Sequence, residues 1–305
     1  MARSYAIYDV FTDVRLAGNP LAVVFDAQGL DERTMQRIAR EFNLSETVFV
    51  LPPENPAHTA RLRIFTPGLE LPFAGHPTVG AAVALAEAAN ESAARPLDLV
   101  CVLEENVGPV RCAVKLDRPD AAFAEFDVPR LSARIAAQFN RQAIADALSL
   151  KPAQIGFENH APSLWSAGVA FVTIPVHDLA AAQSIEFDPA FWERCAPFAE
   201  GRLASAYVYC RGGVHHKARF HARMFAPDMG LGEDPATGSA VAALSGAIHH
   251  FDRLIDGHHA FLVEQGVEME RPSFIHLHLD VAGGAIAAAR IGGQAVRIAA
   301  GQLYL

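Results

Sequence analysis

The chain contains an internal repeat that links its first half to its second half, and this repeat limits the possible folds more than any other feature. One constant offset aligns residues of matching type: Ser45 with Ser205, Val48 with Val208, Phe49 with Tyr209, Arg63 with Arg223, Phe65 with Phe225 and Pro67 with Pro227. The motif R-x-F-x-P therefore occurs twice. Further along, a slightly shorter offset aligns GHPTVGAAVA with EDPATGSAVA, so that His76 falls on Asp234 and Gly80 on Gly238. An ordered repeat of this kind predicts a duplicated structural unit.

Short segments of β-branched and aromatic residues alternate with turn residues, and helical patterns lie between them. Strands are predicted for the segments 6–11, 21–25, 47–51 and 61–66. A helix is predicted for 31–42, because Asp31 suits an N-cap and the apolar residues that follow it recur at helical spacing. A second helix should follow Pro77, since proline suits a first-turn position and an alanine-rich stretch comes next.

These elements predict an α+β fold of two pseudo-symmetric halves, each a bent, mostly antiparallel sheet wrapped around a central helix. A length of 305 residues fits two domains, and we expect them to span 1–128 and 129–305, with the boundary near Pro129. A last hairpin, turning at 291–293, could return to the first half. Equivalent loops of the two halves should then converge on a shared cleft.

The overall composition favours a small-molecule partner. The net charge is −9, and nucleic acid and anionic membranes select basic surfaces instead. The sequence has no secretory signal and no apolar run near the ~20 residues of a membrane span, so we expect no membrane association and a cytoplasmic location. The four cysteines have no CxxC spacing and are expected to be reduced and mostly buried.

The aligned residues His76 and Asp234 are the first candidates for a functional site. Each should lie just before a helix N-terminus, where unpaired N–H groups and the helix dipole attract a substrate carboxylate. Asp234 could instead be only the N-cap of a helix that begins at Pro235, and His76 could be an ordinary core or loop histidine.

Glu46 is a third candidate, at the start of an apolar strand. Removal from water would raise the pKa of its carboxyl group toward that of a working acid–base residue. Its counterpart in the repeat is Ala206, so the proton-transfer task would belong to one half. A solvated glutamate at a strand edge is the alternative interpretation.

Several other patterns do not carry chemistry. The segment GLGEDPATGS lacks the lysine and the glycine spacing of a phosphate-binding loop. The histidine pairs lack HExxH spacing and neighbouring carboxylate ligands, and the chain has no G-x-S-x-G elbow. We therefore expect neither a metal nor a nucleotide cofactor.

With these residues in view, the sequence resembles the PhzF family, named for an isomerase of phenazine biosynthesis. The resemblance rests on GNPLAVV at 18–24, NLSETVFV at 43–50, RIFTPGLELPFAGHPTVG at 63–80 and RMFAPDMGLGEDPATGSA at 223–240. It implies a fold like that of diaminopimelate epimerase and a homodimer without a cofactor. By position, Glu46 matches the family's proton-shuttling glutamate, with His76 and Asp234 as further catalytic residues. The substrate-binding residues expected on this basis are Gly75, Ser239, Gly238, Thr237 and Ser45.

The implied reaction moves a proton between carbons of a small carboxylate that is cyclic or resembles an amino acid, with dihydro-hydroxyanthranilate as one candidate. Epimerases of the same fold use a cysteine at each helix start, whereas His76 and Asp234 stand here. Two alternatives stay open: an epimerase or racemase that uses Glu46 and Asp234 on opposite faces of its substrate, and a dimeric protein that binds a small acid without turnover.

Overall fold

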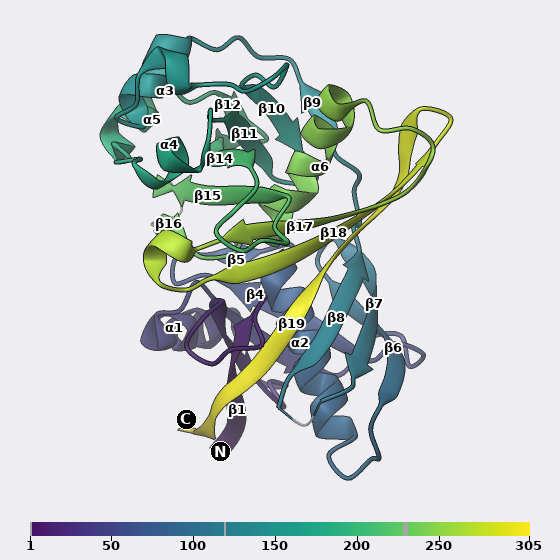
Figure 1. The fold of residues 1–305 in the computed structure, drawn as a ribbon. Coiled ribbons are helices and arrows are strands. Elements are labelled where there is room, and N and C mark those ends of the chain that lie inside the picture. Colours follow the sequence, from purple (N-terminus) through teal and green to yellow (C-terminus); the bar gives the residue numbers. More distant parts are fainter. Residues whose placement is uncertain (1, 119, 228–230) are drawn as a thin grey trace. The chain divides into compact units, whose positions relative to one another are not determined.

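The computed structural model describes residues 2–118, 120–227 and 231–305 and has the α+β architecture expected from the sequence (Figure 1). The chain forms two compact units. Unit 1 consists of Met1–Pro129 and Ile291–Leu305, and unit 2 of Arg130–Arg290. Among the helices of the described segments, none combines the length and the apolar character needed to cross a membrane.

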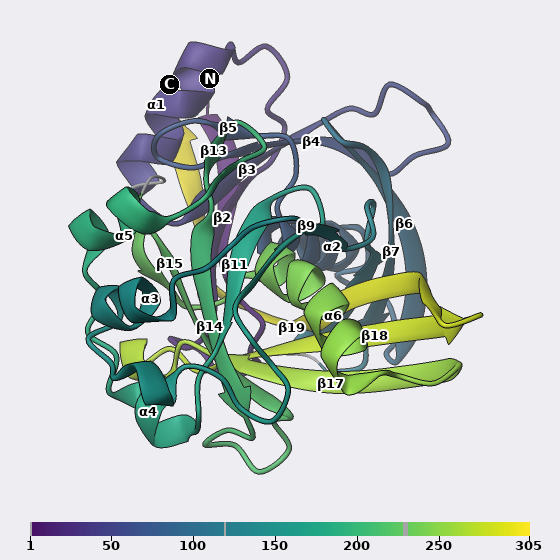
Figure 2. The same cartoon turned by 90° about the horizontal axis from the view of Figure 1, so that it is seen from above.

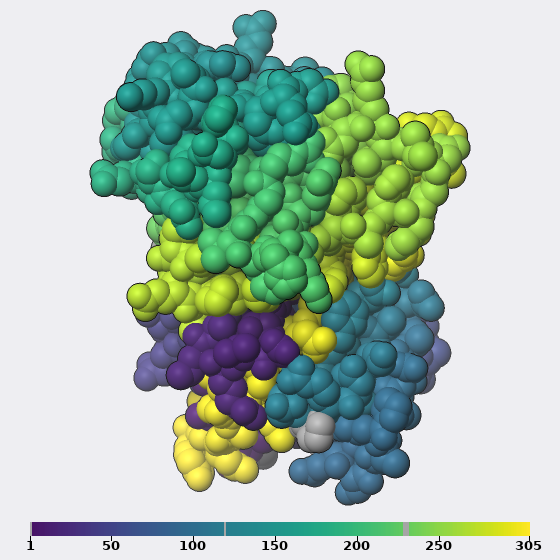
Figure 3. Space-filling view, in the orientation of Figure 1, coloured from purple at the N-terminus to yellow at the C-terminus, as the bar shows by residue number. Residues whose placement is uncertain are grey.

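Unit 1 wraps a sheet around one long buried helix. Its helices are α1 (Glu32–Phe42) and α2 (Gly75–Ala89), and its strands are β1 (Ala2–Val10), β2 (Asn19–Val24), β3 (Glu46–Leu51), β4 (Ala60–Phe65), β5 (Glu70–Leu71), β6 (Leu97–Glu105), β7 (Gly108–Leu116) and β8 (Ala122–Asp127). Helix α2 packs against β1, β2, β7 and β8 and is buried over most of its length. A helix apolar on all sides is stable only in such a core. The hairpin of β6 and β7 exposes alternate residues, and Figure 3 shows it, in blue, at the surface of unit 1.

Unit 2 places helices on both faces of its sheet. Its strands are β9 (Ala133–Ile135), β10 (Ser163–Ser166), β11 (Ala170–Pro175), β12 (Phe198–Ala199), β13 (Arg202–Leu203), β14 (Ser205–Arg211), β15 (Phe220–Ala226), β16 (Leu231–Asp234), β17 (Gly257–Gln265) and β18 (Ser273–Ala282). Its α-helices are α3 (Arg141–Ala147), α4 (Leu179–Gln183), α5 (Pro189–Cys195) and α6 (Gly238–Asp252). Two short 3-10 helices are η1 (Pro152–Gln154) and η3 (Val267–Met269). Figure 2 shows α3, α4 and α5 on one side of β11 and β14 and α6 on the other.

The repeated sequence corresponds to a repeated topology. In unit 1, β2 is parallel to β3, β3 is antiparallel to β4, and β4 is parallel to β6. In unit 2, β11, β14, β15 and β17 follow one another with the same directions. The register also repeats, because Ala60 lies opposite Leu103, and their counterparts Phe220 and Val263 in the repeat lie opposite each other.

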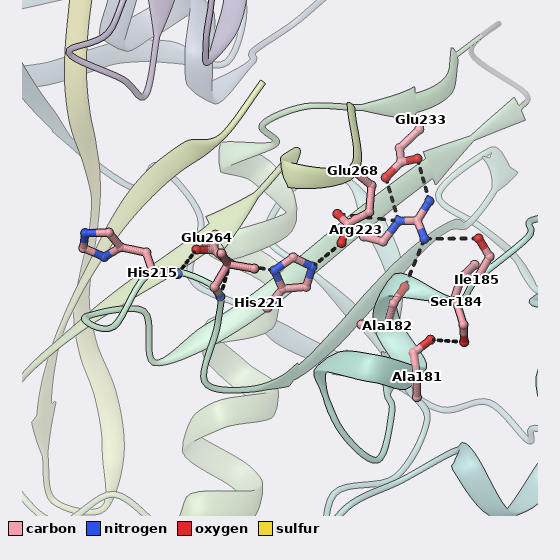
Figure 4. A network of polar contacts seen from close by, with 11 residues as sticks. Ala181, Ala182, Ser184, Ile185, His215, His221, Arg223, Glu233, Glu264 and Glu268 are labelled. Atoms are coloured by element: carbon pink, nitrogen blue, oxygen red, sulfur yellow. Dashed lines mark hydrogen bonds and ion pairs between the residues drawn. The ribbon is translucent and has the colours of Figure 1, made fainter. Parts of the chain in front are cut away.

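The repeated R-x-F motif has the same structural role in both units. Arg63 donates to both carboxylate oxygens of Glu70, at 2.7 and 2.5 Å. Arg223 donates in the same way to Glu233, at 2.8 and 2.9 Å (Figure 4). In each unit the guanidinium carbon also lies 5.1 Å from the ring centre of the phenylalanine two positions later. The motif therefore fastens β4 and β15 to the short strands β5 and β16.

The first helix agrees with the prediction. Its N-cap is Asp31, whose Oδ1 accepts a hydrogen bond of 2.8 Å from the backbone N–H of Thr34. Met35, Ile38 and Ala39 form the buried stripe. Helix α2 begins at Gly75 and not after Pro77, but Pro77 occupies the third helical position, where its missing N–H has no intrahelical partner to lose.

The predicted final hairpin at 291–293 is wrong. Residues Ala285–Tyr304 form one continuous strand, β19, which begins in unit 2 and ends in unit 1. The turn before it is made by Gly283 and Gly284, whose φ angles are 61° and 74°. Gly292 has another function, since a Cβ atom there would lie 2.6 Å from Cβ of Glu125 on β8. Gly292 thus permits close approach of β19 to β8.

Candidate functional site

Glu46 is the first residue of β3 and lies in the interior of unit 1. Asn43 ends α1 in a left-handed conformation, and half-buried Ser45 leads directly into the strand. Strand β3 is inside the sheet, with Leu21 of β2 opposite Glu46. Only 7% of the Glu46 surface is exposed, so the alternative of a solvated edge glutamate is wrong.

His76 is the second residue of α2 and faces Glu46. Its Nδ1 lies 3.4 Å from Oε2 of Glu46, and 4% of its surface is exposed. Burial lowers the pKa of His76 to about 3, although a hydrogen bond to the backbone of Pro20 acts against this shift. The imidazole is therefore neutral near pH 7. Its Nε2 is buried without a hydrogen-bond partner in the part of the chain that the structure describes.

The start of α2 is suited to an anion. Gly75 is the first helical residue, and the N-cap, Ala74, provides no side-chain hydrogen bond. The first turn contains no acidic side chain, and Gly75 and His76 are both buried. The N–H groups of this turn therefore have neither a side-chain cap nor an opposing charge within the turn, which is an arrangement that binds carboxylates and phosphates.

Asp234 occupies a different position from the one expected. Helix α6 begins at Gly238 and its N-cap is Thr237, so Asp234 is not the N-cap of a helix starting at Pro235. It is the last residue of β16, whereas His76 lies inside α2, so the expectation that both residues directly precede a helix is wrong in detail. Asp234 is 5% exposed, and its Oδ2 accepts a hydrogen bond of 2.5 Å from the hydroxyl of Thr237.

The loop from Asp234 to α6 is held by a residue that sequence reasoning did not find. Gln265, the last residue of β17, donates to the carbonyl oxygen of Asp234 at 2.7 Å and to Oγ1 of Thr237 at 3.1 Å. The side-chain oxygen of Gln265, Oε1, accepts hydrogen bonds from the backbone N–H of Thr237 at 3.3 Å and from the hydroxyl of Tyr207 at 3.1 Å. Gly238 and Ser239 follow as the first two residues of the helix.

The predicted residues therefore form two groups. Unit 1 holds Ser45, Glu46, Gly75 and His76, and within it the structure brings Glu46 and His76 together. Unit 2 holds Asp234, Thr237, Gly238 and Ser239, which are consecutive or linked by the hydrogen bond between Thr237 and Asp234. Gln265 is the counterpart in the repeat of Glu105, the last residue of β6, and neither residue stands in a motif that the sequence analysis singled out.

A third ionisable cluster is structural. Ligand-type atoms of Glu158, His160 and Asp252 lie within 4.8 Å of one another. The guanidinium of Arg211 already supplies positive charge there, because it donates to Glu158 at 2.8 Å and to Asp252 at 3.0 Å. His160 also contacts the hydroxyl of Tyr209 at 2.7 Å. An arginine so placed favours an internal ion-pair network over a metal site.

Comparisons with known proteins agree with this architecture. A family model described as phenazine biosynthesis-like protein matches residues 8–301. An uncharacterised isomerase of Mesorhizobium japonicum is 58% identical, with 99% of each chain aligned. A trans-2,3-dihydro-3-hydroxyanthranilate isomerase of Pseudomonas aeruginosa is 35% identical, again over 99% of each chain. A solved PhzF-family structure from Bacillus anthracis covers all of both chains with a TM-score of 0.87 and 24% identity.

Proposed function

The chain belongs to the phenazine biosynthesis-like protein family and is an isomerase, and we propose that Glu46 carries the proton in its reaction. The observation that carries this proposal is the buried contact of 3.4 Å between Glu46 and His76. His76 is neutral, so its contact with Glu46 does not neutralise the carboxylate as an ion pair would. A carboxylate in such a setting is well suited to general acid–base work.

We propose that the substrate is a small carboxylate related to trans-2,3-dihydro-3-hydroxyanthranilate, the compound in the name of the Pseudomonas aeruginosa relative. The uncapped, uncharged start of α2 supports a carboxylate at this site. Glu46 would remove a proton from one carbon of the conjugated system and return it to another. Substrate and product then have the same atoms, and no oxidant or reductant is needed.

His76 and Asp234 would orient the same substrate. Nε2 of His76, which has no hydrogen-bond partner among the described residues, is available for a polar group of the ligand. Asp234 is fixed by Thr237 and Gln265, which gives its carboxylate a defined direction. Gly75, Ser45, Thr237, Gly238 and Ser239 would line the binding site.

We also propose a homodimer in the cytoplasm, which light scattering and cell fractionation can check.

The reaction can be tested with trans-2,3-dihydro-3-hydroxyanthranilate in deuterated water. The expected result is a constitutional isomer whose newly formed C–H position carries deuterium when proton exchange with solvent outpaces return. Exchange with inverted configuration and no shift of the double bonds would identify an epimerase instead. Binding without exchange, across a panel of cyclic and amino carboxylic acids, would identify a binding protein and overturn the proposal.

A further inference from the structure

We propose that Glu105 is a protonated, neutral acid that positions the first turn of α2, and with it His76, by donating a hydrogen bond to Thr78. This inference rests on the proposed role of the α2 start in substrate binding. Glu105 is the last residue of β6 and belongs to neither of the groups of predicted site residues. It is buried, with 7% of its surface exposed.

The hydroxyl group of Thr78 lies close to two oxygen atoms that could accept its single hydrogen. Its Oγ1 lies 2.7 Å from the carbonyl oxygen of Ala74 and 2.8 Å from Oε1 of Glu105. A hydroxyl group has one hydrogen and can donate to only one of these oxygens. Both short contacts are hydrogen bonds when the Thr78 hydroxyl donates to Ala74 and Glu105 donates to the hydroxyl. An ionised Glu105 cannot make that donation.

The environment of Glu105 leads to the same protonation state. Its Oε2 is buried without a hydrogen-bond partner, and Glu105 has no ion pair among the described residues. A buried carboxylate with one hydrogen bond is costly, and the neutral acid avoids that cost. Burial raises the pKa of Glu105 to about 8, and only a hydrogen bond donated by Thr78 to the ionised carboxylate would act to lower it.

Unit 2 contains a similar arrangement, in which a neutral side chain at the end of a strand donates to a threonine at a helix start. Gln265 is the counterpart of Glu105 in the repeat, at the end of β17, which pairs with β15 in the register that β6 has with β4. Gln265 donates to Oγ1 of Thr237 at the start of α6, as Glu105 would donate to Thr78 at the start of α2. Neither helix has a side-chain cap of its own. Each helix start is thus fixed by the last residue of the following strand.

The turn after Glu105 holds the segment before α2 as well. The backbone N–H of Val107 donates to the carbonyl oxygen of Pro72 at 3.1 Å. The side chain of Asn106 donates to Glu70 at 3.1 Å. Consecutive residues of this turn therefore contact the chain on either side of Gly75 and His76, and a shift of the turn would move the helix start.

Charged groups near Glu105 are engaged with one another. Glu105 lies in the wall of a cavity of about 500 Å³, through which its proton can exchange with water. The other ionisable residues of that wall are Glu54, His58, Arg61 and Glu104. Arg61 pairs with Glu54, and His58 pairs with Glu104 at 2.8 Å. On β7, a hydrogen bond with Cys101 and burial raise the pKa of the Cys112 thiol, and a charge on Glu105 would raise the pKa of this thiol as well.

Infrared spectroscopy of the full chain tests the protonation state without any substrate. Wild-type protein at pH 7 should show the carbonyl stretch of a buried carboxylic acid, and this band should disappear in Glu105→Gln and on raising the pH above about 8. The exposed Glu91 provides the control, since Glu91→Gln should leave the band unchanged. A spectrum of Glu105→Gln identical to that of the wild type would overturn the proposal, whatever residue carries the proton in catalysis.

Steady-state kinetics test whether Glu105 positions the start of α2. We expect wild-type kcat to decline above about pH 8 as Glu105 ionises. Glu105→Gln can donate as Gln265 does, so its kcat should stay near the wild-type value at pH 7 and should not show this decline. Glu105→Ala should lose ~10-fold or more in kcat/KM through misplacement of the helix start. The ring resonances of His76 should shift in Glu105→Ala and not in Glu105→Gln. If Glu105→Ala has the kinetics and the His76 resonances of the wild type, Glu105 does not position the site. If Glu105→Ala fails to fold, the pH profile of kcat for Glu105→Gln decides: a decline above about pH 8 in this variant, equal to that of the wild type, overturns the proposal.

Discussion

Nδ1 of His76 lies 3.4 Å from Oε2 of Glu46 in the interior of unit 1. The two side chains come from elements that are separated in the chain, since Glu46 is the first strand residue after α1 and His76 belongs to the first turn of α2. Because burial keeps the imidazole neutral, the contact is not a buried ion pair of two full charges. In the proposed reaction, the carboxylate of Glu46 would take up a proton from the substrate.

Replacing Glu46 with glutamine tests this capacity directly. The variant keeps the shape and hydrogen-bonding groups of the side chain but cannot carry a proton. Turnover and solvent-deuterium incorporation should fall by at least ~100-fold, the usual contribution of a general base, while substrate affinity is retained. Glu41→Gln, on the exposed face of α1, should behave as the wild type. Wild-type exchange in Glu46→Gln would assign the proton transfer to another residue.

Replacing Asp234 with asparagine should affect binding more than chemistry. The carboxylate accepts a 2.5 Å hydrogen bond from Thr237, and its charge would orient polar groups of the substrate. We expect KM to rise with a smaller change in kcat, and the free energy of unfolding to fall by about 1–3 kcal/mol. The measurements are steady-state kinetics and urea denaturation, with the exposed Asp117→Asn as control. An unchanged KM would remove Asp234 from the site.

Much of the local structure could be predicted because its causes are local. Asp31 and the apolar stripe that follows it define α1, and the pattern after Ser45 places Glu46 at the start of a buried strand. The R-x-F motif could be recognised because it occurs twice in the sequence. In the structure, both copies make the same bidentate pair and the same contact with an aromatic ring.

The incorrect predictions involve features fixed by distant residues. An aspartate before a proline resembles an N-cap, but the side chain of Gln265 binds the carbonyl oxygen of Asp234 and Oγ1 of Thr237, and α6 begins only at Gly238. Two glycine pairs lie near the end of the chain, and of these only Gly283 and Gly284 have the positive φ angles of a turn. The close approach of β8 to Gly292 is a tertiary contact that the local sequence does not encode.

The two arginines of the repeat should differ in their contribution to stability. Arg223 is 8% exposed and also donates to the carbonyl oxygens of Ala182 and Ile185 at 3.0 and 3.1 Å, whereas Arg63 is 18% exposed. Lysine cannot reproduce the bidentate geometry. Arg223→Lys should lower the free energy of unfolding by about 2–3 kcal/mol, and Arg63→Lys by about 1 kcal/mol or less. Urea denaturation of both variants checks this order, and equal losses would contradict it.

His221 should make the stability of unit 2 depend on pH. It is fully buried, its Nδ1 lies 2.7 Å from Glu264 and its Nε2 lies 3.0 Å from Glu268 (Figure 4). Burial acts against the charged imidazole, but hydrogen bonds to the two carboxylates outweigh it and raise the pKa of His221 to about 9. The folded protein thus holds a proton that the unfolded chain releases near pH 6.5. Stability from this group is complete below that pH and is lost as the pH rises through about 9.

Replacing His221 with glutamine leaves Glu264 and Glu268 buried without their cation. At pH 7 the free energy of unfolding should fall by about 3–5 kcal/mol, the usual effect of removing one partner from a buried ionic group. Nearby charges contribute little relief, because Arg223 lies 4.0 Å from Glu268 and is already paired with Glu233. Urea denaturation between pH 6 and pH 9 should show a smaller decline of stability in His221→Gln than in the wild type, because Glu105, whose pKa is raised to about 8, contributes to the decline in both proteins. The exposed neighbour variant His216→Gln should retain the full wild-type decline. If His221→Gln also retains it in full, His221 is not responsible for its part of the decline.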